Sequence, residues 1–248
     1  MITRHHFALA LICSLILFSS FLFTRPIIAF LVCTGTCIGS LLPDIHMSRP
    51  KKTGPRTLAW ALVQLPRKAC AWILYRIYAA LELPVTDPTD KRLTHSLPGI
   101  LFITLSSGLL LLIPAYIISP ANTIDGIIFL FGLFLGMIFH LIEDLCTRKG
   151  IFPFFPLSQT QIAGSIRPCD HEDHRIRWFH VLHGGVLLIL LILDGTGILV
   201  PALAFPAGLA GLAICLGIMV YLSDVTVRQA SSPGARVQPA AVQGTGRR

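Results

Sequence analysis

Long apolar stretches alternate with short polar or proline-containing segments along most of the chain. A helix of about 20 apolar residues is long enough to cross the roughly 30 Å hydrocarbon core of a bilayer. The pattern therefore predicts an all-α, polytopic membrane protein with about six transmembrane helices, and we expect residues 1–228 to form a single membrane-embedded domain. The predicted spans are 7–23, 27–42, 97–118, 124–142, 178–193 and 198–222.

Two segments depart from this pattern. The segment 43–96 is basic, and within it the stretch 58–83 mixes Trp and Tyr with Arg and Lys. That mixture is typical of an amphipathic helix lying in the membrane interface, and we expect Pro66 to divide it into two pieces. Residues 229–248 are rich in Pro, Gly, Ala and Gln, a composition that predicts a disordered tail.

The second predicted span carries a sign of close helix packing. Gly35 and Gly39 lie four residues apart, so they share one face of the helix. Small residues at this spacing allow another helix to approach closely in a membrane. We therefore expect a close helix–helix contact at this face.

Composition excludes an ordinary soluble domain. Hydrophobic residues make up 54% of the 248 residues, charged residues only 13%, and the mean hydropathy is +0.73. Soluble domains usually carry about 25% charged residues. The seven cysteines include no close CxxC pair, so neither a disulfide framework nor a zinc ribbon is indicated.

The positive charge is distributed unevenly between the predicted loops. Of the 20 Lys and Arg residues, all except Arg25 fall before the first span, in 43–96, in 143–177 or after the last span. This asymmetry predicts that both termini lie in the cytoplasm and that the protein is a multi-pass protein of the inner (cytoplasmic) membrane. It also accounts for the net charge of +8 without nucleic acid. Because no nucleic-acid-binding module is recognisable, a DNA- or regulator-binding anchor is the least favoured hypothesis.

Histidine and aspartate side chains mark the cytoplasmic ends of several predicted spans. His140 and Asp144 lie four residues apart and therefore share one helix face. Helices joined by short turns pack as neighbours, so the ends of four segments can converge. A set of His and carboxylate groups suits zinc or another divalent ion that activates water. The expected ligands are His6, Asp44, His95, His140 and Asp144, with His6 favoured over His5.

Other ionisable residues are weaker candidates. Glu143, three residues from His140, can reach the same site as a base or bridging ligand, although a solvated side chain is the commoner role at a helix end. The run Asp170-His171-Glu172-Asp173-His174 has the composition of a second metal site, but such loop runs are commonly solvated. For His180 and His183, interfacial placement is favoured over ligation.

The spacing of these residues resembles that of a known family. The pieces are Leu42-Pro43-Asp44, Thr94-His95-Ser96-Leu97, and His140-x-x-x-Asp144-x-x-Thr147-x-x-Gly150 followed by Pro153 and Pro156. Together and in this order, they resemble the YdjM-like family of membrane-bound metal-dependent hydrolases, which is distantly similar to the zinc-dependent phospholipase C superfamily. The resemblance covers roughly residues 1–160, and it selects Asp144 rather than Glu143 as the ligand.

Two positions depart from the family pattern. The family commonly has a second carboxylate where this chain has His46, and a His where it has Asp90. Both substitutes can still ligate a metal, so His46 and Asp90 join His5 and Glu143 as less certain ligands. The departures leave open a catalytically degenerate member of the family.

The resemblance implies a hydrolase that uses a metal-activated water, with zinc the favoured metal. Its catalytic residues would be Asp44, His95, His140 and Asp144. The substrate would be a phosphoester or another ester, either a small molecule or a membrane lipid at the cytoplasmic face.

Three basic residues are the predicted substrate-binding groups. Arg92, Arg148 and Lys149 are positioned in the basic segments to attract an anionic headgroup. A non-enzymatic transporter or metal-binding scaffold is the alternative, but it would need polar residues along the spans beyond their ends, and no ionisable path crosses the apolar runs.

Overall fold

The computed structural model describes residues 3–43, 58–85, 87–120, 122–170 and 172–229. These residues are mostly helical. The helices are α1 (Thr3–Leu17), α2 (Ser19–Thr24), α3 (Pro26–Leu41), α4 (Leu58–Ala80), α5 (Leu97–Ile118), α6 (Asn122–Leu145), α7 (Arg175–Gly195) and α8 (Pro201–Leu222), with a 3-10 helix η1 (Lys91–Leu93). Two short strands, β1 (Thr160–Ala163) and β2 (Thr226–Gln229), complete the described elements.

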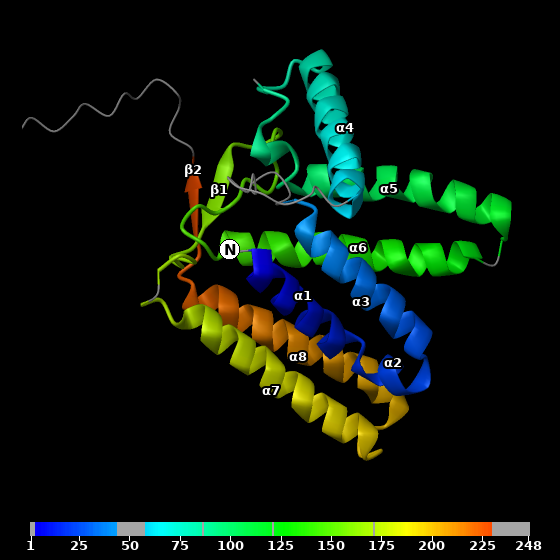
Figure 1. The fold of residues 1–248 in the computed structure, drawn as a ribbon. Helices are drawn as coiled ribbons and strands as arrows, with labels where there is room; N and C mark the ends of the chain where they lie inside the picture. Colours follow the sequence, from blue (N-terminus) through cyan, green and yellow to red (C-terminus); the bar gives the residue numbers. More distant parts are fainter. Residues whose placement is uncertain (1–2, 44–57, 86, 121, 171, 230–248) are drawn as a thin grey trace, which may run out of the picture.

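The helices form a layered bundle with two distinct ends. The turns between α2 and α3, between α5 and α6, and between α7 and α8 lie at one end (Figure 1). The start of α1, the end of α6 and the β1–β2 sheet lie at the other end, and α4 stands at a steep angle to α5 (Figure 1). The polar helix ends therefore gather at one end of the bundle, as the alternation of apolar runs predicts.

Four of the described helices, α5 to α8, are long and apolar enough to cross a membrane. They coincide with the predicted spans over 97–118, 124–142, 178–193 and 198–222. Many of their large apolar side chains are exposed, as lipid-facing side chains would be; Leu109 is 65% exposed and Ile117 76%. The prediction of apolar membrane helices is confirmed for these four segments.

The segments of the first two predicted spans form shorter helices than the prediction requires. The run over 7–23 is divided at Phe18 into α1 and α2, and the run over 27–42 forms α3. With 15 and 16 residues, α1 and α3 are about 22–24 Å long, which is shorter than the roughly 30 Å hydrocarbon core. Six crossings are therefore not confirmed.

Helices α3 and α6 are in backbone contact through glycines on both sides. A Cβ added at Gly35 or Gly39 of α3 would overlap the Phe129 or Leu133 carbonyl oxygen of α6. A Cβ added at Gly136 of α6 would overlap the Thr36 carbonyl oxygen in return. The close contact expected from the spacing of Gly35 and Gly39 is confirmed, and its partner is α6.

The segment after α6 folds back tightly against the end of that helix. Thr147 Oγ1 donates a hydrogen bond to the Asp144 carbonyl (2.7 Å), where the helix ends. Gly150 follows with φ of +58°, and a Cβ there would overlap the Ile162 carbonyl oxygen. These two motif positions therefore have a structural role, which is to turn the chain next to Asp144.

Strands β1 and β2 pair antiparallel, with Thr160 opposite Gln229 and Ala163 opposite Thr226. The all-α prediction is wrong at this point. The sheet forms from four-residue segments that lie far apart in the chain, and neither has an alternating pattern long enough to predict a strand. Apart from Gln229, which ends β2, the predicted tail over 229–248 lies outside the described residues.

Helix α4 occupies much of the predicted interfacial stretch 58–83. It continues through Pro66, so the predicted break is wrong. A proline inside a helix removes one backbone donor at a cost of about 3 kcal/mol, which a 23-residue helix tolerates here. One face packs Leu74 and Tyr78 against Leu93 and Phe155, while Trp72 on another face is 56% exposed.

The glycine contact predicts that alanine destabilises the protein at Gly136 but not at Gly217, a glycine outside the contact. Gly136→Ala forces α3 and α6 apart, and overpacking of this kind typically costs about 1–3 kcal/mol. Gly217→Ala on α8 is the matched control, because among the described residues an added Cβ there would have no atom within 4 Å apart from its chain neighbours and the backbone of its own helix. Thermal unfolding in detergent should show a lower midpoint for Gly136→Ala and an equal or higher midpoint for Gly217→Ala. Equal midpoints for both variants would contradict the contact.

Candidate metal centre

A buried group of His6, His140 and Asp144 lies at the polar end of the bundle. One potential ligand atom from each residue lies within 4.8 Å of the others. His6 comes from the first turns of α1, whereas His140 and Asp144 come from the last turns of α6. The two histidines are fully buried, and Asp144 is 7% exposed.

The contact between α3 and α6 fixes the His140 ring. His140 follows Gly136 by one turn of α6, so its ring reaches the last turn of α3. Its Nδ1 lies 2.7 Å from the Ser40 carbonyl oxygen, and because a carbonyl only accepts, Nδ1 carries the proton. The opposite ring nitrogen, Nε2, lies 3.5 Å from Asp144 Oδ2.

His6 has the same arrangement with a carboxylate in place of the carbonyl. Its Nδ1 lies 2.7 Å from Glu143 Oε2, and its Nε2 lies 3.4 Å from Asp144 Oδ1. The His6 and His140 rings are stacked with their centroids 4.0 Å apart. Glu143 is only 2% exposed, so its predicted role as a solvated neighbour is wrong.

His95 approaches the same carboxylate from the segment before α5. Ser96 caps that helix by accepting a hydrogen bond from the Gly99 amide (3.2 Å), which places His95 just outside the helix. His95 Nδ1 lies 3.1 Å from the Lys91 carbonyl oxygen, and Nε2 lies 4.0 Å from Asp144 Oδ2. The Lys91 ammonium also lies 3.7 Å from Asp144 Oδ2.

One pattern is common to the three histidines. In each ring Nδ1 lies against a carbonyl or carboxylate oxygen, and Nε2 is directed to Asp144. Metal-binding histidines typically have this second contact, because it fixes the tautomer and the ring orientation. Two ligands at 2.0–2.1 Å from a tetrahedral zinc are roughly 3.3 Å apart, close to the 3.4 and 3.5 Å that separate Asp144 from His6 and His140. The chemistry of the residues therefore fits a divalent metal ion.

Of the remaining predicted ligands, His5 and Asp90 are not brought into this group. Asp44 and His46 lie outside the described residues. The His5 ring instead lies against His180, with the centroids 5.4 Å apart. Asp90 caps η1 and contacts Arg92 at 2.7 Å, so its carboxylate is engaged away from Asp144.

The predicted substrate-binding residues also have distinct positions. Arg148 and Lys149 are exposed just beyond the end of α6. The Arg92 guanidinium lies over the Phe155 ring, 4.3 Å from its centroid, in addition to its contact with Asp90. Arg92 is therefore held by the fold, whereas the other two remain accessible.

The segment 170–174 does not form a second metal group among its described residues. Arg175 Nη2 donates to Asp173 Oδ2 at 2.7 Å, and Arg175 Nε donates to Asp173 Oδ1 at 2.8 Å. This guanidinium lowers the pKa of the Asp173 carboxyl to about 2. His183 is fully buried, with Nδ1 donating to the Phe179 carbonyl at 2.7 Å, and it lies outside the group of His6, His140 and Asp144.

Two contributors to the group were missed in the sequence. The Ser40 carbonyl oxygen belongs to the backbone, and no residue type could have marked it. The position of Lys91 could have been inferred from its spacing, because it precedes His95 by four residues and both lie in the segment that leads into α5.

Apolar membrane-length helices with a buried His and Asp group at one end define an integral membrane protein with a candidate metal centre. The model of one family, described as YdjM inner membrane protein, matches residues 1–227. The chain belongs to this family. The match extends through α7 and α8, beyond the motifs at roughly 1–160. No curated protein and no solved structure matches the chain.

A divalent ion should stabilise the folded protein through this group. After treatment with EDTA in detergent, added Zn²⁺ at about 100 times its dissociation constant should contribute about 2.7 kcal/mol and raise the unfolding midpoint by about 5 °C or more. Asp144→Asn keeps the size of the side chain and removes the charge, and it should abolish the shift. His180→Ala, a histidine outside the group, is the control and should retain it. An equal shift in all three proteins would contradict the site.

Proposed function

We propose that the protein is a membrane-bound metal-dependent hydrolase acting on a phosphoester or another ester. The observation that supports this most is the arrangement of three imidazole Nε2 atoms around the single Asp144 carboxylate. His6, His140 and Asp144 would hold the ion, and Asp44 is the further ligand that the family resemblance implies. Zinc is the proposed metal because it accepts mixed His and carboxylate ligands in tetrahedral sites.

A bound divalent ion would supply a water of lowered pKa and would polarise the scissile group. The chain's own residues would supply orientation and proton transfer. His95 has its Nδ1 proton directed at the Lys91 carbonyl, so its Nε2 is the atom that can accept a proton. The Lys91 ammonium, 39% exposed in its side chain, is placed to attract an anionic substrate group.

We propose that this site faces the cytoplasm. The start of α1 and the end of α6 lie at the same end of the bundle as the start of α7 and the β1–β2 sheet (Figure 1). The described Lys and Arg residues in or next to these segments are Arg4, Arg148, Lys149, Arg175, Arg177 and Arg228. Positive residues of this kind favour the cytoplasmic side. Both termini would then be cytoplasmic, and the substrate would reach the site from the cytoplasm or the inner leaflet.

Glu143 is proposed as a positioning residue for His6. Its carboxylate is buried and lies at His6 Nδ1, as in the carboxylate–histidine–zinc arrangement. Glu143→Gln should weaken zinc affinity about 10–100-fold while leaving one bound ion at saturation. Glu172→Gln, at an exposed residue of the segment before α7, is the control with unchanged affinity. Titration against a zinc-competing dye would measure this. Unchanged affinity in Glu143→Gln would contradict the role.

The central test of function combines metal content with hydrolysis. The purified protein should bind a divalent metal and hydrolyse a generic phosphodiester, phosphomonoester or carboxylic ester in a metal-dependent manner. His140→Ala should lose both metal and activity, whereas His183→Gln, a buried histidine outside the group, should retain both.

Other outcomes of this test separate the alternatives. Metal binding without hydrolysis of any of the three substrate classes would contradict the enzyme and favour a metal-binding scaffold or a degenerate family member. Full metal content in His140→Ala would contradict the site itself.

A further inference from the structure

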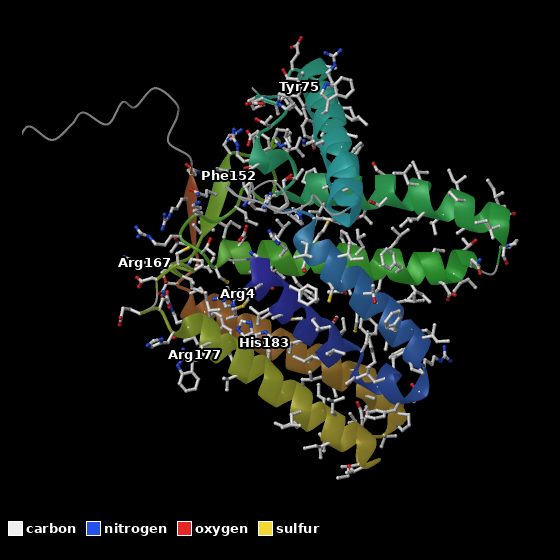
Figure 2. All side chains as sticks on the ribbon, in the orientation of Figure 1. Arg4, Tyr75, Phe152, Arg167, Arg177 and His183 are labelled. Atoms are coloured by element: carbon white, nitrogen blue, oxygen red, sulfur yellow. The ribbon has the colours of Figure 1, made fainter. Side chains whose placement is uncertain are left out.

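A second site adjoins the candidate metal centre on the other side of α1. A cavity of about 500 Å³ lies between the start of α1, the start of α7 and the segment that precedes α7. Arg4 and Arg177 line it, together with His5, His174 and His180. The first turn of α1 thus presents His6 to the metal centre and its preceding residues to the cavity. Figure 2 shows Arg4 and Arg177 near the beginnings of their two helices.

The cavity also contains two carboxylates, but both are engaged by arginines that do not line it. Asp173 receives two hydrogen bonds from the Arg175 side chain, and Asp170 lies 3.7 Å from Arg167. Among the described residues, neither Arg4 nor Arg177 has a carboxylate at ion-pair distance. Two guanidinium groups therefore give the cavity its charge, and guanidinium groups recognise phosphate through paired hydrogen bonds.

The position of the cavity indicates where its ligand comes from. Trp178 follows Arg177 directly and is 65% exposed. Tyr221 is 81% exposed and lies near the end of α8, at the same end of the bundle as the start of α7 (Figure 1). Exposed Trp and Tyr residues at the ends of membrane helices lie at the level of the lipid headgroups. Arg177 therefore lies at the polar edge of α7, where a lipid phosphate is available.

We propose that this cavity binds the phosphate group of an anionic phospholipid through Arg4 and Arg177. Hydrolysis of the bound lipid rests on the proposed hydrolase function, whereas binding of the lipid does not. The edge-to-face contact between His5 and His180 joins α1 to α7 across the cavity. A headgroup held there would lie next to the turn of α1 that carries His6.

The test measures binding rather than activity. The full-length protein in phosphatidylcholine–detergent mixed micelles is titrated with phosphatidylglycerol, and separately with inorganic phosphate. The double variant Arg4→Gln/Arg177→Gln should bind phosphatidylglycerol at least tenfold more weakly. Arg4→Lys/Arg177→Lys keeps the charges but not the paired guanidinium hydrogen bonds, so its affinity should lie between those of the unchanged protein and the Gln variant. An unchanged thermal unfolding midpoint of the Gln variant excludes misfolding as the cause. Arg228→Gln, an exposed arginine on β2, should bind as the unchanged protein does.

Two results would overturn the proposal. Equal weakening in Arg228→Gln would show that surface charge in general attracts the lipid. Inorganic phosphate binding as tightly as phosphatidylglycerol would assign the cavity to soluble anions. The titration is repeated on EDTA-treated His140→Ala protein, in which retained lipid binding is expected. The lipid-binding proposal and the proposed hydrolase function can therefore fail independently, because lipid binding in the arginine variants is measured without any hydrolysis.

Discussion

The contact between α3 and α6 determines where the candidate site forms. Glycines on both helices bring the backbones so close that an added Cβ would overlap a carbonyl oxygen of the other helix. In a membrane, where lipid tails compete with apolar side chains, such close packing is a principal source of helix association. The same approach brings the last turn of α3 to His140, whose Nδ1 lies 2.7 Å from the Ser40 carbonyl oxygen. A residue larger than glycine at Gly136 would move this ring away from its acceptor.

The electrostatics of the site follow from that geometry. Buried carboxylates and imidazole lone pairs are costly unless they are neutralised by protons, by cations or by one another. Asp144 is surrounded by Nε2 atoms of three histidines and by the Lys91 ammonium. Because the Nδ1 of His95 and of His140 lies against a carbonyl oxygen, each neutral ring directs a lone pair toward the carboxylate. A divalent ion held by His6, His140 and Asp144 would offset the cost of burying these acceptors.

Much of this arrangement could be predicted from the sequence. Apolar runs located the membrane-length helices, the spacing of Gly35 and Gly39 predicted the close contact, and the spacing of His140 and Asp144 predicted their shared face. His6 was favoured over His5, and the structure places His6 in the group while His5 contacts His180. In each case the signal was local in the chain or followed from the alternation of apolar and polar segments.

The features that could not be predicted depend on partners distant in the chain. Glu143 looks like any acidic residue at a helix end until the packing of α1 brings His6 to it. Asp90 had a plausible metal role, but Arg92, two residues later, is a nearer partner. The β1–β2 pairing joins segments more than 60 residues apart. Residue type and spacing describe what a side chain can do, whereas its tertiary neighbours decide which of these contacts it makes.

The most direct test of the proposed metal centre is X-ray absorption at the zinc edge of the purified, zinc-loaded protein. The account predicts a first shell of nitrogen and oxygen at about 2.0–2.1 Å, with the outer-shell scattering of at least two imidazoles. The outer-shell imidazole signal should fall in His140→Ala. A shell containing sulfur at about 2.3 Å, which would assign the metal to cysteines, or a spectrum without imidazole scattering would contradict the account.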